Sequence, residues 1–327
     1  MTSFAKNSIL SLMQYGREGP QKADLAAGDI WEKGEATMEK RISGRTGLLG
    51  LIGSPVGHSG SPAMYNYSFE KLGLDYAYLA FDIKAEEVAR AIEAMKTLHM
   101  RGLNVTMPCK NEAAKYMDEL SPAARIMGAV ITIVNEDGKL IGYNTDGQGF
   151  VDNLRDHGVE VRGKKIIVCG GGGAATAIQV QCALEGAREI SIFNRKDGFF
   201  DRTVGTGEKI MEEKPECIVN VFDITDQEKM REEIASSDIF TNATILGMKP
   251  MEEESVIKDV SMLRPGLVVV DIVYDPKETK LLKDAKEAGC ICIDGQGMLL
   301  WQGAAALKLY TGKDMPVDEV KELFFRS

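Results

Sequence analysis

The chain alternates between short apolar runs, typical of buried strands, and stretches whose apolar residues recur at helical spacing. Up to residue 146 the predicted strands are 47–53, 76–81, 102–108, 129–135 and 140–143, and the predicted helices are 63–72, 84–97, 110–119 and 123–127. The last two strands flank Glu136-Asp137-Gly138, a turn signal that predicts a hairpin. This part is expected to form a small α/β domain.

A helix predicted at 148–157 leads into a more regular alternation. The predicted strands are 166–168, 189–193, 217–222, 239–242, 266–272 and 290–293. A helix is predicted directly after the first of these strands, and further helices are predicted at 205–214, 227–236, 277–288, 297–310 and 317–325. Strand–helix alternation of this kind predicts a parallel, doubly wound sheet. We therefore expect an α/β protein with a Rossmann-type domain at 147–297 and a smaller α/β substrate-binding domain formed by 47–146 plus 298–327.

Residues 1–46 show no clear strand or helix period and are rich in glycine and charge. We interpret them as a loosely ordered extension, or as a segment that is not part of the native protein. Met38 would serve as an ordinary start, because Lys33-Gly34-Glu35 is compatible with a purine-rich ribosome-binding stretch upstream of it. Intact-mass measurement on the native protein would exclude that hypothesis if Met1 or Thr2 were the terminus.

Four glycines, Gly170 to Gly173, follow the apolar strand at 166–168 and precede an Ala-rich helical stretch. Read as G-x-G-x-x-A, the pattern places Gly170 in the tight turn, Gly172 where backbone approaches a pyrophosphate, and Ala175 at the helix–strand contact. A plain βα turn would use glycine as well. The next strand ends in Asn194-Arg-Lys-Asp197, where a Rossmann unit reads the ribose, and this favours a dinucleotide site.

Composition narrows the class of function. The 327 residues contain 44% hydrophobic and 27% charged residues, as a globular protein does, and no apolar run approaches the ~20 residues of a membrane span. A net charge of −10 argues against nucleic acid or an anionic membrane as partner. Six cysteines without a CxxC pair and three histidines without zinc spacing argue against a metal site. We expect a cytoplasmic protein.

Four further segments are polar where strands end or helices begin. His58-Ser-Gly-Ser-Pro62 offers two hydroxyls before a helix; Ser61 as an N-cap explains one of them, and both together would hold a carboxylate. Asn104-Val-Thr-Met-Pro-Cys-Lys110 places a lysine after a strand, either as a surface residue or turned back by the proline over Asn104 and Thr106. Asn144-Thr-Asp-Gly147 is either a turn with an Asp N-cap or part of a site. The fourth is Gly297-Met-Leu-Leu-Trp-Gln302, with one amide.

Together with the glycine loop, these segments resemble the shikimate dehydrogenases. The matching motifs are Gly53-Ser-Pro-Val-Gly-His-Ser-Gly-Ser-Pro62, Asn104-Val-Thr-Met-Pro-Cys-Lys110, Asn144-Thr-Asp-Gly147, Gly171-Gly-Gly-Ala174, Asn242-Ala-Thr244 and Gly297-Met-Leu-Leu-Trp-Gln302. The stretch Phe193-Asn-Arg-Lys-Asp-Gly-Phe-Phe200 and the tryptophan in the last motif favour the quinate/shikimate dehydrogenase branch. The resemblance covers the chain from about Gly47 onward.

The resemblance implies an NAD(P)-dependent oxidoreductase that interconverts shikimate and 3-dehydroshikimate, or quinate and 3-dehydroquinate. Lys110 and Asp146 would be the catalytic pair on a ring hydroxyl, because a lysine ammonium is a suitable acid toward a carbonyl oxygen. The substrate, a cyclohexane or cyclohexene carboxylate, would contact Ser59, Ser61, Thr106, Lys110, Asp146 and Gln302. The cofactor would contact Gly170, Gly171, Gly172, Gly173, Ala174, Asn194, Arg195, Lys196, Asp197, Asn242, Thr244, Val273, Tyr274 and Gly297.

One position departs from the family pattern. The family's Gly-Ala-Val-Asn-Thr reads Gly128-Ala-Val-Ile-Thr132 here, so Ile131 replaces an asparagine that would bind the ring. A substrate polar group left unpaired in a closed pocket costs ~1–3 kcal/mol. This keeps open two alternatives: a weak or silent relative that binds cofactor and ligand, and an aminoshikimate-type dehydrogenase.

The residues after the second Rossmann strand favour different cofactors. Arg195 and Lys196 suit the 2′-phosphate of NADP, whereas Asp197 suits the free ribose hydroxyl of NAD. The sequence predicts NAD, with NADP accepted as well. We expect a monomer or homodimer with a small-molecule substrate and no nucleic-acid or membrane partner.

Overall fold

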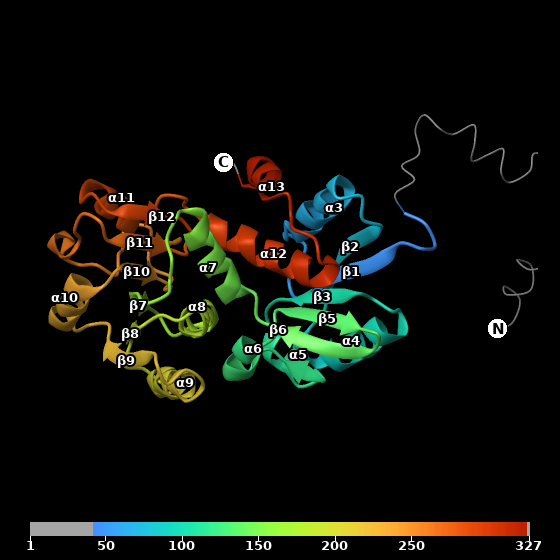
Figure 1. Ribbon diagram of the computed structural model, residues 1–327, viewed down its shortest axis with the longest axis horizontal. Helices are drawn as coiled ribbons and strands as arrows, with labels where there is room; N and C mark the ends of the chain where they lie inside the picture. The colour runs from blue at the N-terminus through green and yellow to red at the C-terminus, as the bar shows by residue number, and fades with distance from the viewer. Residues whose placement is uncertain (1–41, 326–327) are drawn as a thin grey trace, which may run out of the picture. The chain divides into compact units, whose positions relative to one another are not determined.

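Two six-stranded sheets organise residues 42–325, the part of the chain that the computed structural model describes. Residues 1–41 of the predicted extension, which include the proposed start at Met38, lie outside the described residues. The first sheet has the order β2-β1-β3-β5-β6-β4 (Figure 1). Its strands are β1 (Gly47–Gly53), β2 (Tyr76–Asp82), β3 (Gly102–Val105), β4 (Glu119–Leu120), β5 (Thr132–Glu136) and β6 (Lys139–Tyr143).

The first sheet is mixed. β1 lies parallel to β2 and β3, β5 lies antiparallel to β3 and β6, and β4 lies parallel to β6. Asp137 and Gly138 both have positive φ at the tip of the β5–β6 hairpin, as the Asp-Gly signal predicts. The helices of this part are α3 (Ser61–Lys71), η1 (Ala85–Glu87), α4 (Val88–Thr97), α5 (Lys110–Ala114) and α6 (Pro122–Met127).

The second sheet is parallel throughout, with the order β12-β11-β10-β7-β8-β9. Its strands are β7 (Lys165–Cys169), β8 (Glu189–Asn194), β9 (Ile218–Asp223), β10 (Ile239–Asn242), β11 (Val268–Asp271) and β12 (Ile291–Ile293). Helices α8 (Gly173–Leu184), α9 (Phe200–Glu213), α10 (Gln227–Ser236), η2 (Val260–Met262) and α11 (Lys280–Glu287) connect them. The order reverses between β7 and β10, which is where doubly wound sheets bind ligands.

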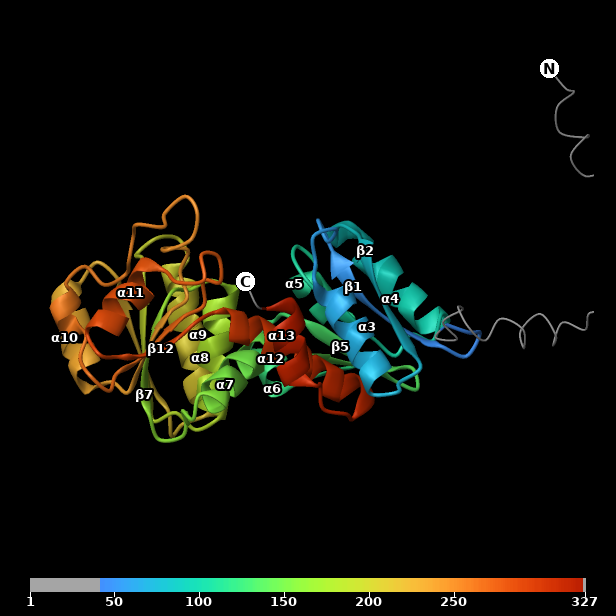
Figure 2. The same ribbon diagram turned by 90° about the horizontal axis from the view of Figure 1, so that it is seen from above.

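Two helices, α7 (Asp146–Asp156) and α12 (Gln296–Thr311), lie side by side between the sheets (Figures 1 and 2). Their backbones touch at Gly149, where an added Cβ would come within 2.5 Å of the Gln302 amide nitrogen. Such close packing requires glycine at this position. The last helix, α13 (Val317–Phe324), packs against α12 and α3.

Each sheet is covered on both faces by apolar side chains, as the alternation along the strands requires. In β1, Leu49 and Leu51 face the cluster shared with α3 and α12, whereas Ile52 faces the cluster shared with α4. In β7, Ile166 and Ile167 divide in the same way between the two faces of the second sheet. The α/β fold class and its Rossmann-type sheet are confirmed.

The predicted elements all occur, but several predicted ends are wrong. α5 stops at Ala114 because Asp118 turns the chain toward β6, donating its N–H to the Leu140 carbonyl and accepting from the Leu140 N–H. α9 begins at Phe200, five residues before the predicted start. The strand predicted at 102–108 ends at Val105, although the Thr106 N–H still donates to the Ile52 carbonyl at 2.9 Å. The spacing of apolar residues alone predicts the ends of helices and strands poorly, because hydrogen bonds to individual residues decide where an element ends.

No helix within residues 42–325 combines the length and apolarity needed to cross a membrane. All six cysteines are free thiols, four of them buried. In the same part of the chain, no three His, Cys, Asp or Glu side chains come together in a metal-binding arrangement.

Candidate active site

The loops that follow β1 and β3 run side by side at the carboxyl edge of the first sheet. The Ser54 N–H donates to the Met107 carbonyl at 3.0 Å, and Gly53 lies against Thr106 so closely that a Cβ there would clash with the Met107 carbonyl. The predicted carboxylate-binding segment and the predicted lysine segment are therefore neighbours. The register of two parallel strands brings them together.

Ser59 and Ser61 stand at the start of α3. The interpretation of Ser61 as an N-cap is wrong, because Gly60 occupies the cap position and Ser61 is the first helical residue. The Ser61 N–H instead donates to the Ser59 hydroxyl at 3.2 Å. With Pro62 next, the first turn presents both hydroxyls at the positive end of an 11-residue helix.

Lys110 and Asp146 form an ion pair with 3.1 Å between Nζ and Oδ2, and their side chains are only 24% and 19% exposed. Each is the first residue of its helix, α5 and α7 respectively. One interpretation of the sequence made Asp146 the N-cap of α7, and that interpretation is wrong because Thr145 holds the cap position. The carboxylate lies at the positive end of α7. The structure thus brings together the two residues predicted to be catalytic.

A buried chain of polar side chains lies behind this pair. The Tyr78 hydroxyl donates to Asn104 Oδ1 at 2.8 Å, and Asn104 Nδ2 donates to Thr132 Oγ1 at 3.2 Å. Thr132 Oγ1 lies 3.0 Å from Thr145 Oγ1, the residue that caps α7. Asn104 is therefore engaged inside the sheet, whereas the predicted placement of Lys110 over Asn104 and Thr106 stays a prediction. The chain connects β2, β3 and β5 to the start of the helix that carries Asp146.

The remaining positions singled out in the sequence are the predicted substrate contact Gln302 and Ile131, which departs from the family pattern. Gln302 lies in the second turn of α12, and its Nε2 donates to the Leu299 carbonyl at 3.0 Å. Ile131 is buried, with its N–H bonded to the Tyr143 carbonyl and its carbonyl accepting from the Val105 N–H at 2.7 Å. Its neighbour Val130 donates its N–H to the Lys110 carbonyl, so residue 131 lies near one of the two residues predicted to be catalytic.

A cavity of about 840 Å³ adjoins the glycine loop at the switch point of the second sheet. Gly170 has φ +125°, and a Cβ there would lie 2.6 Å from the Ala243 carbonyl, so only glycine fits the turn. Gly172 is the cap residue of α8, and a Cβ there would meet nothing within 4 Å. The open space in front of this helix end suits an anion such as a pyrophosphate.

The residues after β8 form the rim of this cavity. Asn194 is buried and donates to Thr203 Oγ1 at 2.9 Å, which fixes it under the glycine loop. Arg195 Nη2 lies 3.3 Å from Asp197 Oδ2 in an exposed pair. Lys196 Nζ lies 5.9 Å from the centre of the Phe200 ring. The rim thus presents both signs of charge, as the sequence predicts.

Asn242 holds the loop after β10 from within. Its Oδ1 accepts from the Thr244 N–H and hydroxyl, and its Nδ2 donates to Asp271 Oδ1 at 2.9 Å. Burial raises the pKa of Asp271 to about 6, and hydrogen bonds from Thr279, the Val273 N–H and Asn242 limit the rise. This arrangement positions Thr244 at the cavity.

Some predicted cofactor residues do not line the cavity, and some residues that line it were not predicted. The predicted cofactor residues that do not line the cavity are Lys196, Asn242, Val273, Tyr274 and Gly297. Their contacts with a cofactor stay a prediction. Two cationic side chains that were not predicted, Arg202 and Lys258, line the cavity. A helix predicted to begin at Phe200 would have drawn attention to Arg202, because this residue lies in its first turn, shortly after the residues 194–197 predicted to bind the ribose.

Family models match two segments of the chain, one near each end of the described residues. The model for the shikimate dehydrogenase substrate binding domain matches residues 51–133. The model for the shikimate 5'-dehydrogenase C-terminal domain matches residues 295–323. These segments contain the serine pair, the lysine segment and Gln302.

The similarity to known proteins covers most of the chain. The chain is 51% identical to shikimate dehydrogenase (NADP(+)) of Listeria monocytogenes over 288 residues, which is 88% of this chain and 99% of that protein. A crystal structure of shikimate 5-dehydrogenase from Listeria monocytogenes in complex with shikimate and NAD has a TM-score of 0.86 at 51% identity, covering 88% of this chain and 99% of that one. Quinate dehydrogenase from Corynebacterium glutamicum in complex with NAD has a TM-score of 0.76 at 29% identity, covering 86% and 99%.

Proposed function

Because the chain belongs to the shikimate dehydrogenase family, we propose that it interconverts shikimate and 3-dehydroshikimate with NAD or NADP. The chain is an oxidoreductase, and its likeness to functional dehydrogenases supports this interpretation over a silent ligand-binding relative. Quinate is the second candidate substrate, in view of the similarity to a quinate dehydrogenase. The observation that carries the proposal is the half-buried pair of Lys110 and Asp146.

The chain's own part in the reaction is to hold the substrate and move one proton. In the reducing direction, the Lys110 ammonium donates a proton to the carbonyl oxygen; in the oxidising direction, its amine takes the proton from the hydroxyl. Asp146 orients Lys110 and accepts a hydrogen bond from the reacting hydroxyl. The chemistry that NAD(P) supplies when bound is hydride transfer.

The other substrate contacts are proposed from the placement of the loops. Ser59 and Ser61 would bind the substrate carboxylate at the start of α3, where the helix dipole favours an anion. Thr106, one loop away, and Gln302 of α12 would contact the ring hydroxyls. Gln302 can exchange its bond to the Leu299 carbonyl for one to a substrate because the partner carbonyl belongs to its own helix.

The cavity at the glycine loop fits a dinucleotide. The space before Gly172 is open, Gly170 has the conformation that the tight turn needs, and the cavity extends to Arg195 and Asp197. We propose that Gly170, Gly171, Gly172, Gly173 and Ala174 hold the pyrophosphate, and that Asn194, Arg195, Asp197 and Thr244 hold the rest of the cofactor.

Gly172→Ala is expected to weaken cofactor binding without unfolding the chain. The backbone of Gly172 is extended (φ −77°, ψ 178°), so alanine fits the fold, but its methyl enters the proposed pyrophosphate space. Inserting a methyl into an occupied site costs about 1–3 kcal/mol, or about 5- to 150-fold in Kd. Titration of NADPH fluorescence measures this. Gly205→Ala, equally open but in α9, is the matched control; an unchanged Kd in Gly172→Ala would contradict the assignment.

Asp197→Ala is expected to shift preference toward NADP. It removes a carboxylate that would repel the 2′-phosphate and releases Arg195, which is 76% exposed. We expect the ratio of kcat/KM for NADP to that for NAD to rise about tenfold, in line with a charge-assisted hydrogen bond of about 1.5 kcal/mol. Asp201→Ala in the first turn of α9 is the control. Equal ratios in wild type and Asp197→Ala would remove Asp197 from cofactor selection.

Ile131→Asn tests the departure from the family pattern within the assay that tests the function. Shikimate and quinate are each assayed by NAD(P)H absorbance with NAD and with NADP, for wild type and variant. We expect wild-type turnover of shikimate, and about 5- to 10-fold higher kcat/KM in the variant, the worth of one added hydrogen bond of about 1–1.5 kcal/mol. No turnover of either substrate by either protein would contradict the proposed function.

The domain division, the assembly and the location are further parts of the proposal. We propose that residues 47–146 with 298–327 form the substrate-binding domain and that residues 147–297 form the cofactor domain. The six free thiols suit a reducing compartment such as the cytoplasm. We propose that the protein is a monomer or a homodimer, and sedimentation measurements would distinguish the two states.

A further inference from the structure

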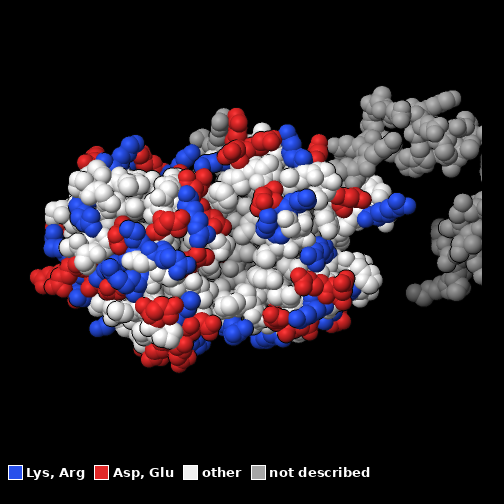
Figure 3. Space-filling model, viewed as in Figure 1, with Lys and Arg blue, Asp and Glu red and all other residues white. Residues whose placement is uncertain are grey.

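A second cavity, of about 1040 Å³, lies beside α7 and α12, and none of the proposed catalytic residues lines it. We call it the α7–α12 cavity. It is lined from α6 by Pro122 and Ala123, from β6 and the segment after it by Tyr143, Asn144 and Thr145, and by residues of α7, α8, α12, α13 and the loop before α13. Figure 3 shows a hollow of mostly uncharged atoms on the face that carries α7 and α12.

The cavity uses the face of α7 that points away from the catalytic pair. Gln148, Asp152 and Asp156 line it, and they form one stripe because they are spaced four residues apart. Asp146 precedes Gln148 by two residues, which is about 200° around a helix. A ligand here would therefore be separate from the substrate while contacting the same helix.

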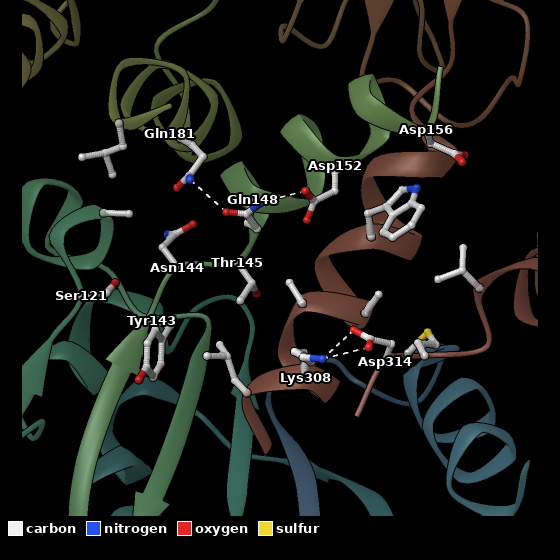
Figure 4. A pocket seen from close by; sticks show the side chains of 18 of the residues that line it. Ser121, Tyr143, Asn144, Thr145, Gln148, Asp152, Asp156, Gln181, Lys308 and Asp314 are labelled. Carbon is white, nitrogen blue, oxygen red and sulfur yellow. Dashed lines mark hydrogen bonds and ion pairs between the residues drawn. The ribbon is translucent and has the colours of Figure 1, made fainter. Parts of the chain in front are cut away.

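Two side chains that line the cavity, Asn144 and Trp301, have buried polar atoms without a hydrogen-bond partner in the described chain, and Asn144 has two such atoms. Asn144 is 6% exposed, and neither its Oδ1 nor its Nδ2 makes a hydrogen bond within the described chain. Its amide points toward the side of the cavity where Gln148 and Gln181 lie (Figure 4). Those two residues are engaged: Gln181 donates to Gln148 Oε1, and Gln148 donates to Asp152 Oδ1. A buried amide with both atoms unpaired destabilises the fold, and a ligand that bonds to it would remove that cost.

The charges around the cavity have one dominant sign. Five carboxylates line it (Asp152, Asp156, Asp314, Asp318 and Glu319), against one cation, Lys308, which is already paired with Asp314. Cations outside the lining pair with three of the others: Arg155 with Asp152, Lys321 with Asp156, and Lys71 with Glu319. Within residues 42–325, Asp318 makes no ion pair. The unpaired Asp318 carboxylate favours a cationic ligand.

The rest of the wall is apolar. Trp301 of α12 faces the cavity together with Leu184, Ala304, Ala305, Leu309, Met315 and Val317. A ring or short alkyl body would bury apolar surface against these side chains, which favours binding. A tryptophan face also attracts a cation.

We propose that the α7–α12 cavity binds a small amphipathic organic cation, a primary amine with an aromatic or alkyl body and a hydrogen-bonding group. The ammonium lies among the carboxylates, the body lies against Trp301, and the polar group pairs with the Asn144 amide. The site is independent of the proposed reaction, and its test needs neither cofactor nor substrate.

The test uses tyramine as the amine, and 3-(4-hydroxyphenyl)propanoate as a probe of the same shape with an anionic end. Isothermal titration calorimetry on the full chain is expected to show one tyramine site and at least tenfold weaker binding of the anion. Equal binding of the two, or no binding of tyramine, would overturn the proposal, and the cavity would then hold water only.

Three variants locate the binding. Ala305→Leu fills the cavity from a half-buried position and is expected to abolish tyramine binding while leaving the melting temperature near that of wild type. Asp318→Asn is expected to weaken binding about 2- to 5-fold, as loss of an exposed charge does. Asn144→Leu is expected to raise the melting temperature, because it removes an unpaired buried amide, and to weaken tyramine binding. Tyramine binding unchanged in Ala305→Leu and Asn144→Leu would place it elsewhere and overturn the proposal.

Discussion

Replacing Lys110 by alanine is expected to lower kcat by about 100-fold or more, the usual worth of a general acid–base group. The fold should tolerate the change, because Lys110 is the first residue of a short helix and keeps its backbone bond to Val130. Asp146, left without its partner, still lies at the positive end of α7. Single-turnover measurement of hydride transfer separates this loss from slower product release.

Lys115→Ala is the matched control for Lys110→Ala. Lys115 follows the same helix, is 67% exposed and pairs with Glu112 at 2.6 Å, so its loss should leave kcat within about twofold. Asp146→Asn and the double variant complete the set. If the pair acts as a unit, the double variant is little slower than Lys110→Ala alone. A near-wild-type rate in Lys110→Ala would remove Lys110 from the chemistry.

Glu233→Gln is expected to lower the free energy of unfolding by about 3 kcal/mol at neutral pH. Glu233 lies under the second sheet and is only 9% exposed; its Oε2 lies 2.7 Å from Lys165 Nζ and accepts from the Ser191 hydroxyl at 2.7 Å, and its Oε1 lies 3.0 Å from Lys229 Nζ. Burial alone would raise the pKa of Glu233, but these hydrogen bonds outweigh it and lower the pKa to about 2. A shift from 4.5 to about 2 corresponds to about 3 kcal/mol.

The effect of Glu233→Gln should depend on pH in a defined direction. Because the folded-state pKa is depressed, the stabilisation is fully present above pH 4.5 and is lost as pH falls toward 2. Urea unfolding of wild type and variant should therefore differ most at neutral pH and converge in acid. Glu232→Gln, which alters an exposed pair with the same Lys229, is the control and should change stability by less than about 1 kcal/mol. A pH-independent difference would contradict this origin of the stability.

The sequence predicted the fold and the chemistry where these depend on local signals. Apolar period identified every strand of the second sheet, because a parallel strand is buried on both faces and reads as an apolar run. The glycine spacing located the loop beside the second-sheet cavity for a similar reason: Gly170 has a positive φ, and a Cβ at Gly172 would meet nothing within 4 Å. Short motifs were also sufficient to identify the family.

Signals that depend on side-chain bonds across the chain were misread or missed. Ser61 and Asp146 look like N-caps in sequence, yet each lies inside its helix, because the cap position is decided by the backbone one residue earlier. Arg202 was missed because the helix was predicted to begin at Gly205, whereas it begins at Phe200. Asn104 looks like a site residue, but it bonds to Tyr78 and Thr132 within the sheet.

What the sequence by itself determined is therefore the order of elements, the family and the kinds of residue at the site. The tertiary structure alone decided which of them meet. Lys110 and Asp146 stand 36 positions apart and come within 3.1 Å only because β5 and β6 pair antiparallel and return the chain to α5. The unpaired Asn144 and the stripe of α7 that faces the second cavity are likewise invisible in sequence. Local patterns report each residue's own backbone and burial, whereas contacts between distant residues depend on how whole elements pack.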